Sequence, residues 1–131
     1  MARRRWRALA VVMASGAIFD LLFGTAILLA PAPAAGLLGI ELPPDRVHLR
    51  LNGLLLLILA AVYALPALRP ERFHPIAPIA ACGRVLGFLV LAAAWRSGSP
   101  RVFFWLGTAD LFLAAGTGLA WVAARRPSPS D

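Results

Sequence analysis

The sequence predicts an all-α fold, an integral membrane four-helix bundle in which the chain runs up, down, up and down. First, 60% of its 131 residues are hydrophobic and 15% are charged, with a mean hydropathy of +0.78, whereas soluble domains are close to half apolar and a quarter charged. Second, the apolar residues form four stretches, each near the ~20 residues that a helix needs to cross a bilayer. Third, the connections are short, so we expect consecutive helices to lie antiparallel and adjacent.

We place the spans at about residues 6–29, 48–65, 75–95 and 102–124. Residues 1–124 then form a single transmembrane domain. The tail 125–131 is polar and proline-rich, and we expect it to be disordered.

The connections explain where each span begins and ends. Two pairs of prolines, in APAP and LPPD, end the first span and delay the second, because proline cannot continue a helix. The GLLGIEL segment between them is too short to cross, and we expect it in the outer interface as a turn of helix or an extended strip. PALRPERFHP is a compact polar hairpin, and RSGSP is a tight turn whose proline starts the last helix.

The arginines predict the orientation. All 13 basic residues are arginine, and most lie at span ends. Eight flank one set of ends (Arg3, Arg4, Arg5, Arg7, Arg69, Arg72, Arg125 and Arg126), and four flank the other (Arg46, Arg50, Arg96 and Arg101). Basic residues are retained on the cytoplasmic side, so we expect both termini in the cytoplasm of a bacterium and the protein in its inner membrane. These arginines suit anionic lipid headgroups, and no soluble domain is left to present them to nucleic acid.

Aromatic residues mark the span ends. Five such rings lie at or within about a turn of a proposed end, namely Trp6, Tyr63, Trp95, Trp105 and Trp121. Tryptophan and tyrosine favour the headgroup region, so we interpret these residues as interface anchors.

A secretory signal is the alternative for the first span. RRRWR, an apolar run and the small residues Ala32-Pro33-Ala34 resemble one. Signal cores are about 7–15 residues long, whereas this run exceeds twenty and contains Asp20, which favours a retained helix. Cleavage at this site would leave three spans and an external N-terminus.

Each span pairs polar with small residues, which are the groups that pack helices in lipid. We expect Gly16, Gly24, Gly87 and Gly107 to allow close approach. The predicted inward faces are Gly16, Asp20 and Gly24 in the first span; Asn52, Leu56, Leu59 and Tyr63 in the second; Ala77, Ala80, Arg84 and Gly87 in the third; and Gly107, Asp110, Ala114 and Thr117 in the fourth. Only in the second span is the glycine, Gly53, beside that face and not on it.

The charged residues within the spans form a candidate site. Asp20 and Arg84 fall near mid-span, Asp110 slightly to the outer side, and Arg50 and Asn52 in the outer quarter, so all five fit the external half of one bundle. Two aspartates and two arginines sum to zero charge, and pairing removes much of the cost of a charge in lipid. One hypothesis is that these pairs only fix helix register. The other is a binding site for a proton or cation, or for an anionic or quinone-like headgroup.

Other chemistry has little support in the sequence. Cys82 is single, and His48 and His74 are predicted on opposite sides of the membrane, so we expect no metal site and no haem. Ser15 has no base near it in sequence, and no nucleophile motif or phosphate-binding loop occurs.

The layout resembles the small four-helix bacterial inner-membrane proteins of the DoxX-like kind. The segments concerned are DLLFGTAILLAPAPAAGLLGI, RLNGLLLL, GRVLGFLVL and GTADLFLA, which together cover most of the chain. The resemblance implies association with membrane redox assemblies and carries over no catalytic residue. The layout is also similar to small multidrug exporters, which have an acid in the first of four helices, but Arg84 would compete there with a cationic substrate.

From these observations we expect a non-catalytic accessory or assembly subunit of a larger membrane complex. It would bind a lipid or quinone headgroup at its outer polar cluster. The alternative is a minimal ion-coupled transporter that uses Asp20 or Asp110 as the exchangeable acid and works as a homodimer.

Overall fold

The computed structural model describes residues 2–126, and the side chains of residues 5–126. This part of the chain contains no strand and is helical apart from short connections. Its elements are α1 (Ala2–Leu29), α2 (Pro31–Leu38), α3 (Val47–Leu68), α4 (Pro70–Phe73), α5 (Ile76–Arg96) and α6 (Arg101–Arg125). Four of them, α1, α3, α5 and α6, are long and apolar enough to cross a membrane. The predictions of an all-α fold and of four apolar helices are confirmed.

The helix boundaries differ from the predicted spans by a few residues. The helix of the second span, α3, does not stop at residue 65 but continues through Pro66 to Leu68. Pro66 lies in the last turn, where its missing N–H costs the helix one hydrogen bond near its end. The last helix includes Arg125, so the prediction of a tail from residue 125 is wrong for that residue. Residues 127–131 of the predicted tail lie outside the described residues.

The segment between the first two spans forms a short helix and then an extended strip. Pro31 occupies the first turn of α2, where no N–H is needed. Gly39 ends α2 with φ 65°, a left-handed conformation that glycine adopts without strain, and the N–H of Ile40 returns to the carbonyl of Ala35 at 3.0 Å. Oδ1 of Asp45 then accepts the N–H of Val47 at 2.8 Å, at the start of α3.

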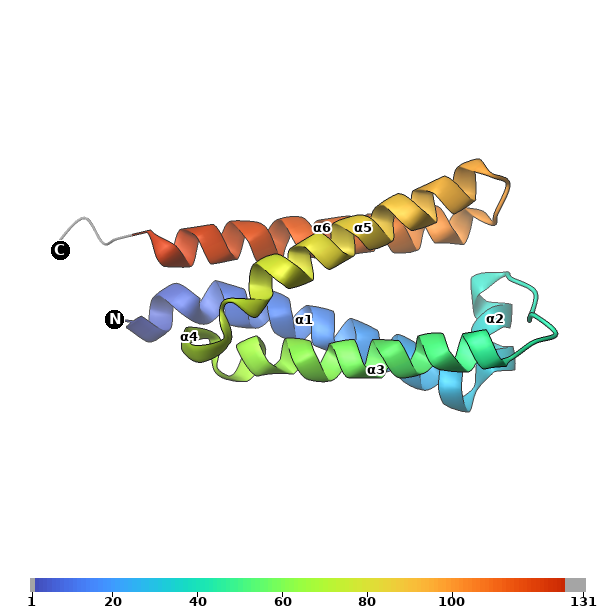
Figure 1. Ribbon diagram of the computed structural model, residues 1–131, viewed down its shortest axis with the longest axis horizontal. Coiled ribbons are helices and arrows are strands. Elements are labelled where there is room, and N and C mark those ends of the chain that lie inside the picture. The colour runs from blue at the N-terminus through green and yellow to red at the C-terminus, as the bar shows by residue number, and fades with distance from the viewer. Residues whose placement is uncertain (1, 127–131) are drawn as a thin grey trace.

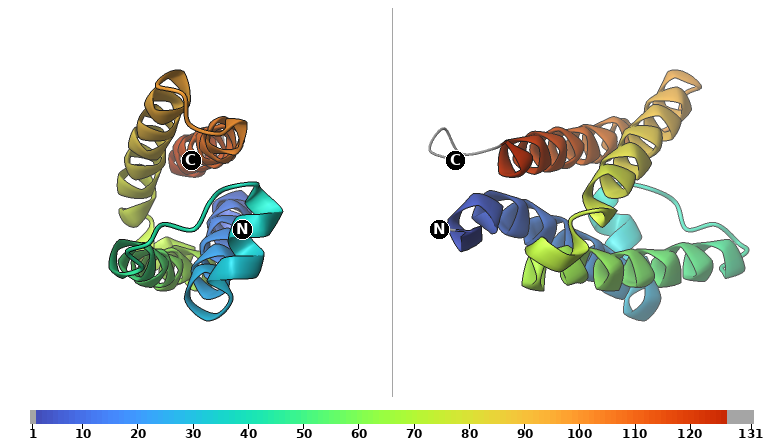
Figure 2. Two further views of the ribbon diagram at one scale, coloured as in Figure 1. Left: turned by 90° about the vertical axis from the view of Figure 1, so that its right-hand side faces the viewer. Right: turned by 60° about the vertical axis from the view of Figure 1, so that its left-hand side comes forward.

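The four long helices form two pairs. Their direction alternates along the chain, and the two ends of the described chain lie at the same end of the molecule (Figure 1). α1 packs along α3, and α5 packs along α6. Contacts between α1 and α6 hold the two pairs together. α3 and α5 have few contacts and diverge away from α4 (Figures 1 and 2). The expectation that all consecutive helices lie adjacent is therefore wrong for α3 and α5.

Glycines bring α1 and α3 together. A Cβ on Gly24 would stand 2.8 Å from the carbonyl oxygen of Gly53, and a Cβ on Gly53 would stand 3.2 Å from that of Gly24. On the predicted inward face of the second span Tyr63 is buried, whereas Asn52 and Leu59 are exposed, and Gly53, which the sequence places beside that face, is buried against α1. The backbones of α1 and α3 approach so closely here that only glycine fits, because any side chain at this position would separate the two helices.

All four long helices meet at the end that carries the termini. Their buried side chains form one cluster there: Leu9, Met13, Tyr63, Ala77, Ala80 and Ala120. Trp6 and Trp121 pack against it, and Trp6 stacks on His74 with ring centroids 5.0 Å apart. At the other end Trp95 and Trp105 are exposed. The bundle is thus closed at the end with the termini.

Apolar side chains cover the outside of the molecule. Each long helix exposes large ones, for example Leu22 of α1 at 64%, Leu55 of α3 at 56%, Ile79 of α5 at 73% and Phe112 of α6 at 75%. Water-soluble monomers rarely expose contiguous apolar patches of this extent. This surface suits contact with lipid hydrocarbon or with other membrane helices.

Candidate functional site

The side chain of Arg84 links three helices at the centre of the molecule. Nη2 donates to Oδ2 of Asp20 on α1 at 2.9 Å, and to the carbonyl oxygen of Gly16 at 3.3 Å. Nη1 donates to Oδ1 of Asp110 on α6. Arg84, Asp20 and Asp110, which we call the Arg84 triad, make the only aspartate–arginine contacts among the described side chains.

Glycines make room for the triad. A Cβ on Gly16 would stand 2.9 Å from Nη2 of Arg84, and one on Gly87 would stand 3.2 Å from Oδ2 of Asp110. The sequence predicted small residues on the faces that carry Asp20 and Arg84, and the structure places them against the charged groups. Gly107 packs instead against Phe88 and Leu91 of α5.

Tyr63 of α3 completes the surroundings of the guanidinium. Its ring is 5% exposed, and Cζ of Arg84 lies 5.0 Å from the ring centroid. Such a cation–π contact contributes on the order of 1–2 kcal/mol when desolvated. The sequence assigns Tyr63 both to the membrane interface and to the inward face of the second span, and the structure places its side chain inside the bundle and not on the outer surface.

The formal charges of the triad do not balance when both aspartates are ionised. The sequence predicts two arginines with two aspartates, but Arg50 is exposed and has no ion-pair partner among the described side chains. With both aspartates ionised, one guanidinium faces two carboxylates and the net formal charge is −1. Among the described residues, Asn52 makes no hydrogen bond to the triad. It does line the cavity that lies beyond the triad.

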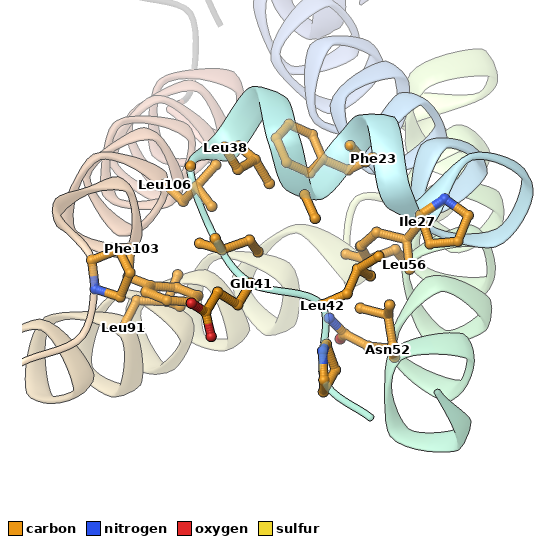
Figure 3. Close-up of a pocket in the computed structure, with 18 of the residues that line it drawn as sticks. Phe23, Ile27, Leu38, Glu41, Leu42, Asn52, Leu56, Leu91, Phe103 and Leu106 are labelled. Atoms are coloured by element: carbon orange, nitrogen blue, oxygen red, sulfur yellow. The ribbon is translucent and has the colours of Figure 1, made fainter. Parts of the chain in front are cut away.

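Beyond the triad, the two helix pairs border a partly open cavity of about 870 Å³. Its walls come from the second half of α1, from α2 and the strip after it, from the start of α3, and from the facing ends of α5 and α6. Figure 3 shows apolar side chains facing this space from both pairs, with the strip that carries Glu41 and Leu42 between them. The labelled apolar residues are Phe23, Ile27, Leu38, Leu42, Leu56, Leu91, Phe103 and Leu106.

The two aspartates form the deep end of this cavity. Apart from Phe19, Asp20 is the lining residue of α1 nearest the closed end of the bundle, and Asp110 is the corresponding residue of α6. The side chain of Asp110 is 21% exposed and that of Asp20 is 4% exposed. Arg84 does not line the cavity. A molecule in the cavity would therefore meet carboxylates before it met the guanidinium.

Glu41 is a cavity residue that the sequence reasoning missed. It is exposed, and it lines the cavity from the strip after α2. Its position as the one acid in an otherwise apolar, proline-framed segment was an available signal. The short helix α2, which covers this part of the cavity, was predicted only as one of two alternatives.

The remaining candidates form no second centre. Cys82 is exposed on α5, and Nδ1 of His48 lies 3.0 Å from Oδ2 of Asp45 near the start of α3. No group of three or more histidine, cysteine, aspartate or glutamate side chains that could hold a metal occurs in the described part of the chain.

Comparisons with protein-family models, with curated proteins and with solved structures find no match to this chain. The resemblance to the DoxX-like proteins stays a prediction from layout. The fold itself defines the class: four candidate membrane spans suggest a multi-pass membrane protein.

Proposed function

We propose that this protein is a multi-pass membrane protein that binds an amphiphilic molecule, such as a lipid or a quinone, in the cavity between its two helix pairs. The observation that supports this is a space of about 870 Å³ with apolar walls and a polar deep end. Pockets for small ligands have this size and this composition, with a few polar groups that fix orientation. The protein then acts without chemistry of its own, as an accessory or assembly subunit in a bacterial inner membrane.

The exposed apolar surface supports the accessory role. Large side chains project from all four long helices, and they can contact the helices of a larger complex as readily as lipid. Purification from native membranes in mild detergent tests this. Co-purification of a larger membrane complex supports an accessory subunit, and isolation of the chain alone or as a homodimer contradicts it.

A pair of alanines in α2 tests the cavity itself. Ala34 lines the cavity, whereas Ala32, two residues earlier, is exposed and does not. We expect wild type and Ala32→Phe to retain a bound amphiphile that mass spectrometry identifies after purification. Ala34→Phe fills part of the space and should lose it. Equal retention by both variants would place the bound molecule elsewhere and refute the proposal.

A second candidate is an ion-coupled transporter. It is favoured by the two carboxylates that share one guanidinium, because a proton or cation would neutralise the excess charge. Asp110 is the better exchangeable acid, since its side chain is more exposed than that of Asp20 and lies on the cavity wall. Uptake into vesicles that depends on pH and is abolished by Asp110→Asn supports transport; the absence of uptake in wild type rules it out for the solutes tested.

A further inference from the structure

We propose that the molecule held in the cavity is a cationic amphiphile, with a protonated amine at the deep end and an apolar body between the helix pairs. This inference rests on the proposed function, namely that the cavity holds an amphiphile. It adds the charge of the head group, which the sequence left open between anionic, quinone-like and cationic.

The charges on the cavity wall carry the inference. Three acids line the cavity, Asp20, Glu41 and Asp110, and its described lining contains no arginine, lysine or histidine. Arg84, the cation paired with the two aspartates, lies behind them, and the arginines at the ends of the neighbouring helices (Arg46, Arg50, Arg96 and Arg101) do not line the cavity. The wall of the cavity therefore carries only acidic charged groups, and low-dielectric surroundings strengthen their attraction for a cation.

One carboxylate oxygen that accepts no hydrogen bond from the described residues provides a second observation. The Asp20 side chain is 4% exposed, and its Oδ2 accepts the hydrogen bond from Arg84. Its Oδ1 accepts none from any described residue, although Asp20 lines the cavity. Oδ1 is therefore open to the cavity and free to accept an N–H from a ligand there.

An anionic head group fits this site poorly. It would approach Asp20 and Asp110 before Arg84, whose two Nη atoms already donate to those carboxylates. Arg50, the other arginine that the sequence assigned to the site, does not line the cavity. One positive charge from the ligand would instead bring the triad from −1 to neutral, which an apolar environment favours.

The walls suit the apolar body of such a ligand. Phe19, Phe23 and Phe103 line the cavity together with aliphatic side chains. Aromatic faces attract cations as well as hydrocarbon. The alkyl chain of a long-chain amine and its charged end therefore both find matching surfaces in one cavity.

The test uses three probes with the same alkyl chain: dodecylamine, dodecanol and dodecanoate. The full-length protein is placed in phosphatidylcholine nanodiscs at pH 7, where an alkylamine is protonated as a lysine side chain is. Binding of each radiolabelled probe is measured after subtraction of the signal from empty discs. We expect dodecylamine to bind at least about tenfold more tightly than dodecanol, and dodecanoate to bind more weakly than either.

Three variants locate the effect. Asp20→Asn and Asp110→Asn each remove one charge at the deep end and should abolish most of the preference for the amine. Glu71→Gln, which removes an exposed acid on α4 outside this cavity, should leave it unchanged. If Asp20→Asn fails to fold, Asp110→Asn still decides, because the side chain of Asp110 is the more exposed of the two and lines the same end of the cavity.

The outcomes separate this inference from the proposed function. Equal binding of all three probes, or tighter binding of dodecanoate, overturns the cationic head group and leaves an amphiphile-binding cavity standing. Binding of no probe above empty discs, with no amphiphile retained by the purified wild type, overturns both. Preference for the amine that the two aspartate variants do not reduce also refutes the site proposed here.

Discussion

Nη2 of Arg84 donates a hydrogen bond to Oδ2 of Asp20 at 2.9 Å, although 64 residues separate the two along the chain. The bond joins α5 to α1, and so joins the two helix pairs, at the inner end of the cavity. Both side chains are buried, at 7% and 4% exposure. Because α3 and α5 have few contacts, the relative position of the pairs depends on this bond and on the packing of α1 against α6.

Removal of the guanidinium should destabilise the protein. In Arg84→Gln two carboxylates lose their only cation, and loss of one member of a buried ion pair costs on the order of 3–5 kcal/mol. We expect a decrease of about 3 kcal/mol in the free energy of unfolding, measured by SDS titration in mixed micelles. Arg84→Lys keeps the charge but not the planar fork that reaches both acids, so its loss should be smaller. If Arg84→Gln unfolded at the same SDS fraction as wild type, the ion pairs of Arg84 would not stabilise the protein as inferred here.

The charge of the triad predicts an unusual pattern for its aspartates. Asp20→Asn or Asp110→Asn alone brings the net formal charge from −1 to zero and leaves one ion pair. Each single variant should therefore unfold at an SDS fraction equal to or higher than that of wild type. The double variant leaves Arg84 without a counter-ion and should lose several kcal/mol, on the order of 3–5. The same SDS titration measures all three. If each single variant were as damaging as the double one, the triad would not carry the excess negative charge.

The glycine contact between α1 and α3 should be sensitive to one added methyl group. A Cβ at Gly24 meets a backbone oxygen of Gly53 at 2.8 Å, and a backbone atom cannot move aside alone. We expect Gly24→Ala to cost about 1–3 kcal/mol, as overpacking does elsewhere. Thermal unfolding in nanodiscs checks this.

The control for this variant is Gly118→Ala. Gly118 of α6 has open space where a Cβ would stand, with no heavy atom within 4 Å. Alanine is the better helix former by roughly 0.5–1 kcal/mol, so this variant should be neutral or slightly more stable. Equal effects of the two substitutions would show that close approach of α1 and α3 is not what the glycine provides.

The arginine distribution predicts which end faces the cytoplasm. In a background of Cys82→Ser, Glu71→Cys on α4 marks the end with the termini and Ser99→Cys the opposite end. A membrane-impermeant maleimide should label Ser99→Cys in spheroplasts, and should label Glu71→Cys only after the membrane is opened. The reverse pattern would invert the orientation and would open the cavity toward the cytoplasm.

Much of the fold could be read from the sequence because its signals are local. Pro31 and Gly39 fix where helices break, and four long apolar runs can satisfy their backbone groups in lipid only as helices. The faces of the first, third and fourth spans were also correct in large part. Asp20, Arg84 and Gly107 each lie buried on the face where small residues gather.

The second span shows where this reasoning stops. Gly53 packs against α1, whereas its neighbour Asn52, about 100° away around the helix, lines the cavity between the pairs. In lipid the outer face is as apolar as the inner, so hydropathy gives little guidance. The glycine was selected by the close approach of another backbone, which only the folded chain reveals.

By itself, then, the sequence determined the helices, their ends and the charged residues that need partners in an apolar setting, because each depends on residues close together in the chain. Tertiary structure alone decided which of those charges meet, that Arg50 stays outside while Tyr63 lies beneath the guanidinium, and that the helix pairs border a partly open cavity. Those outcomes depend on the distance between helix axes and on the rotation of each helix, and such quantities are set by contacts between distant segments.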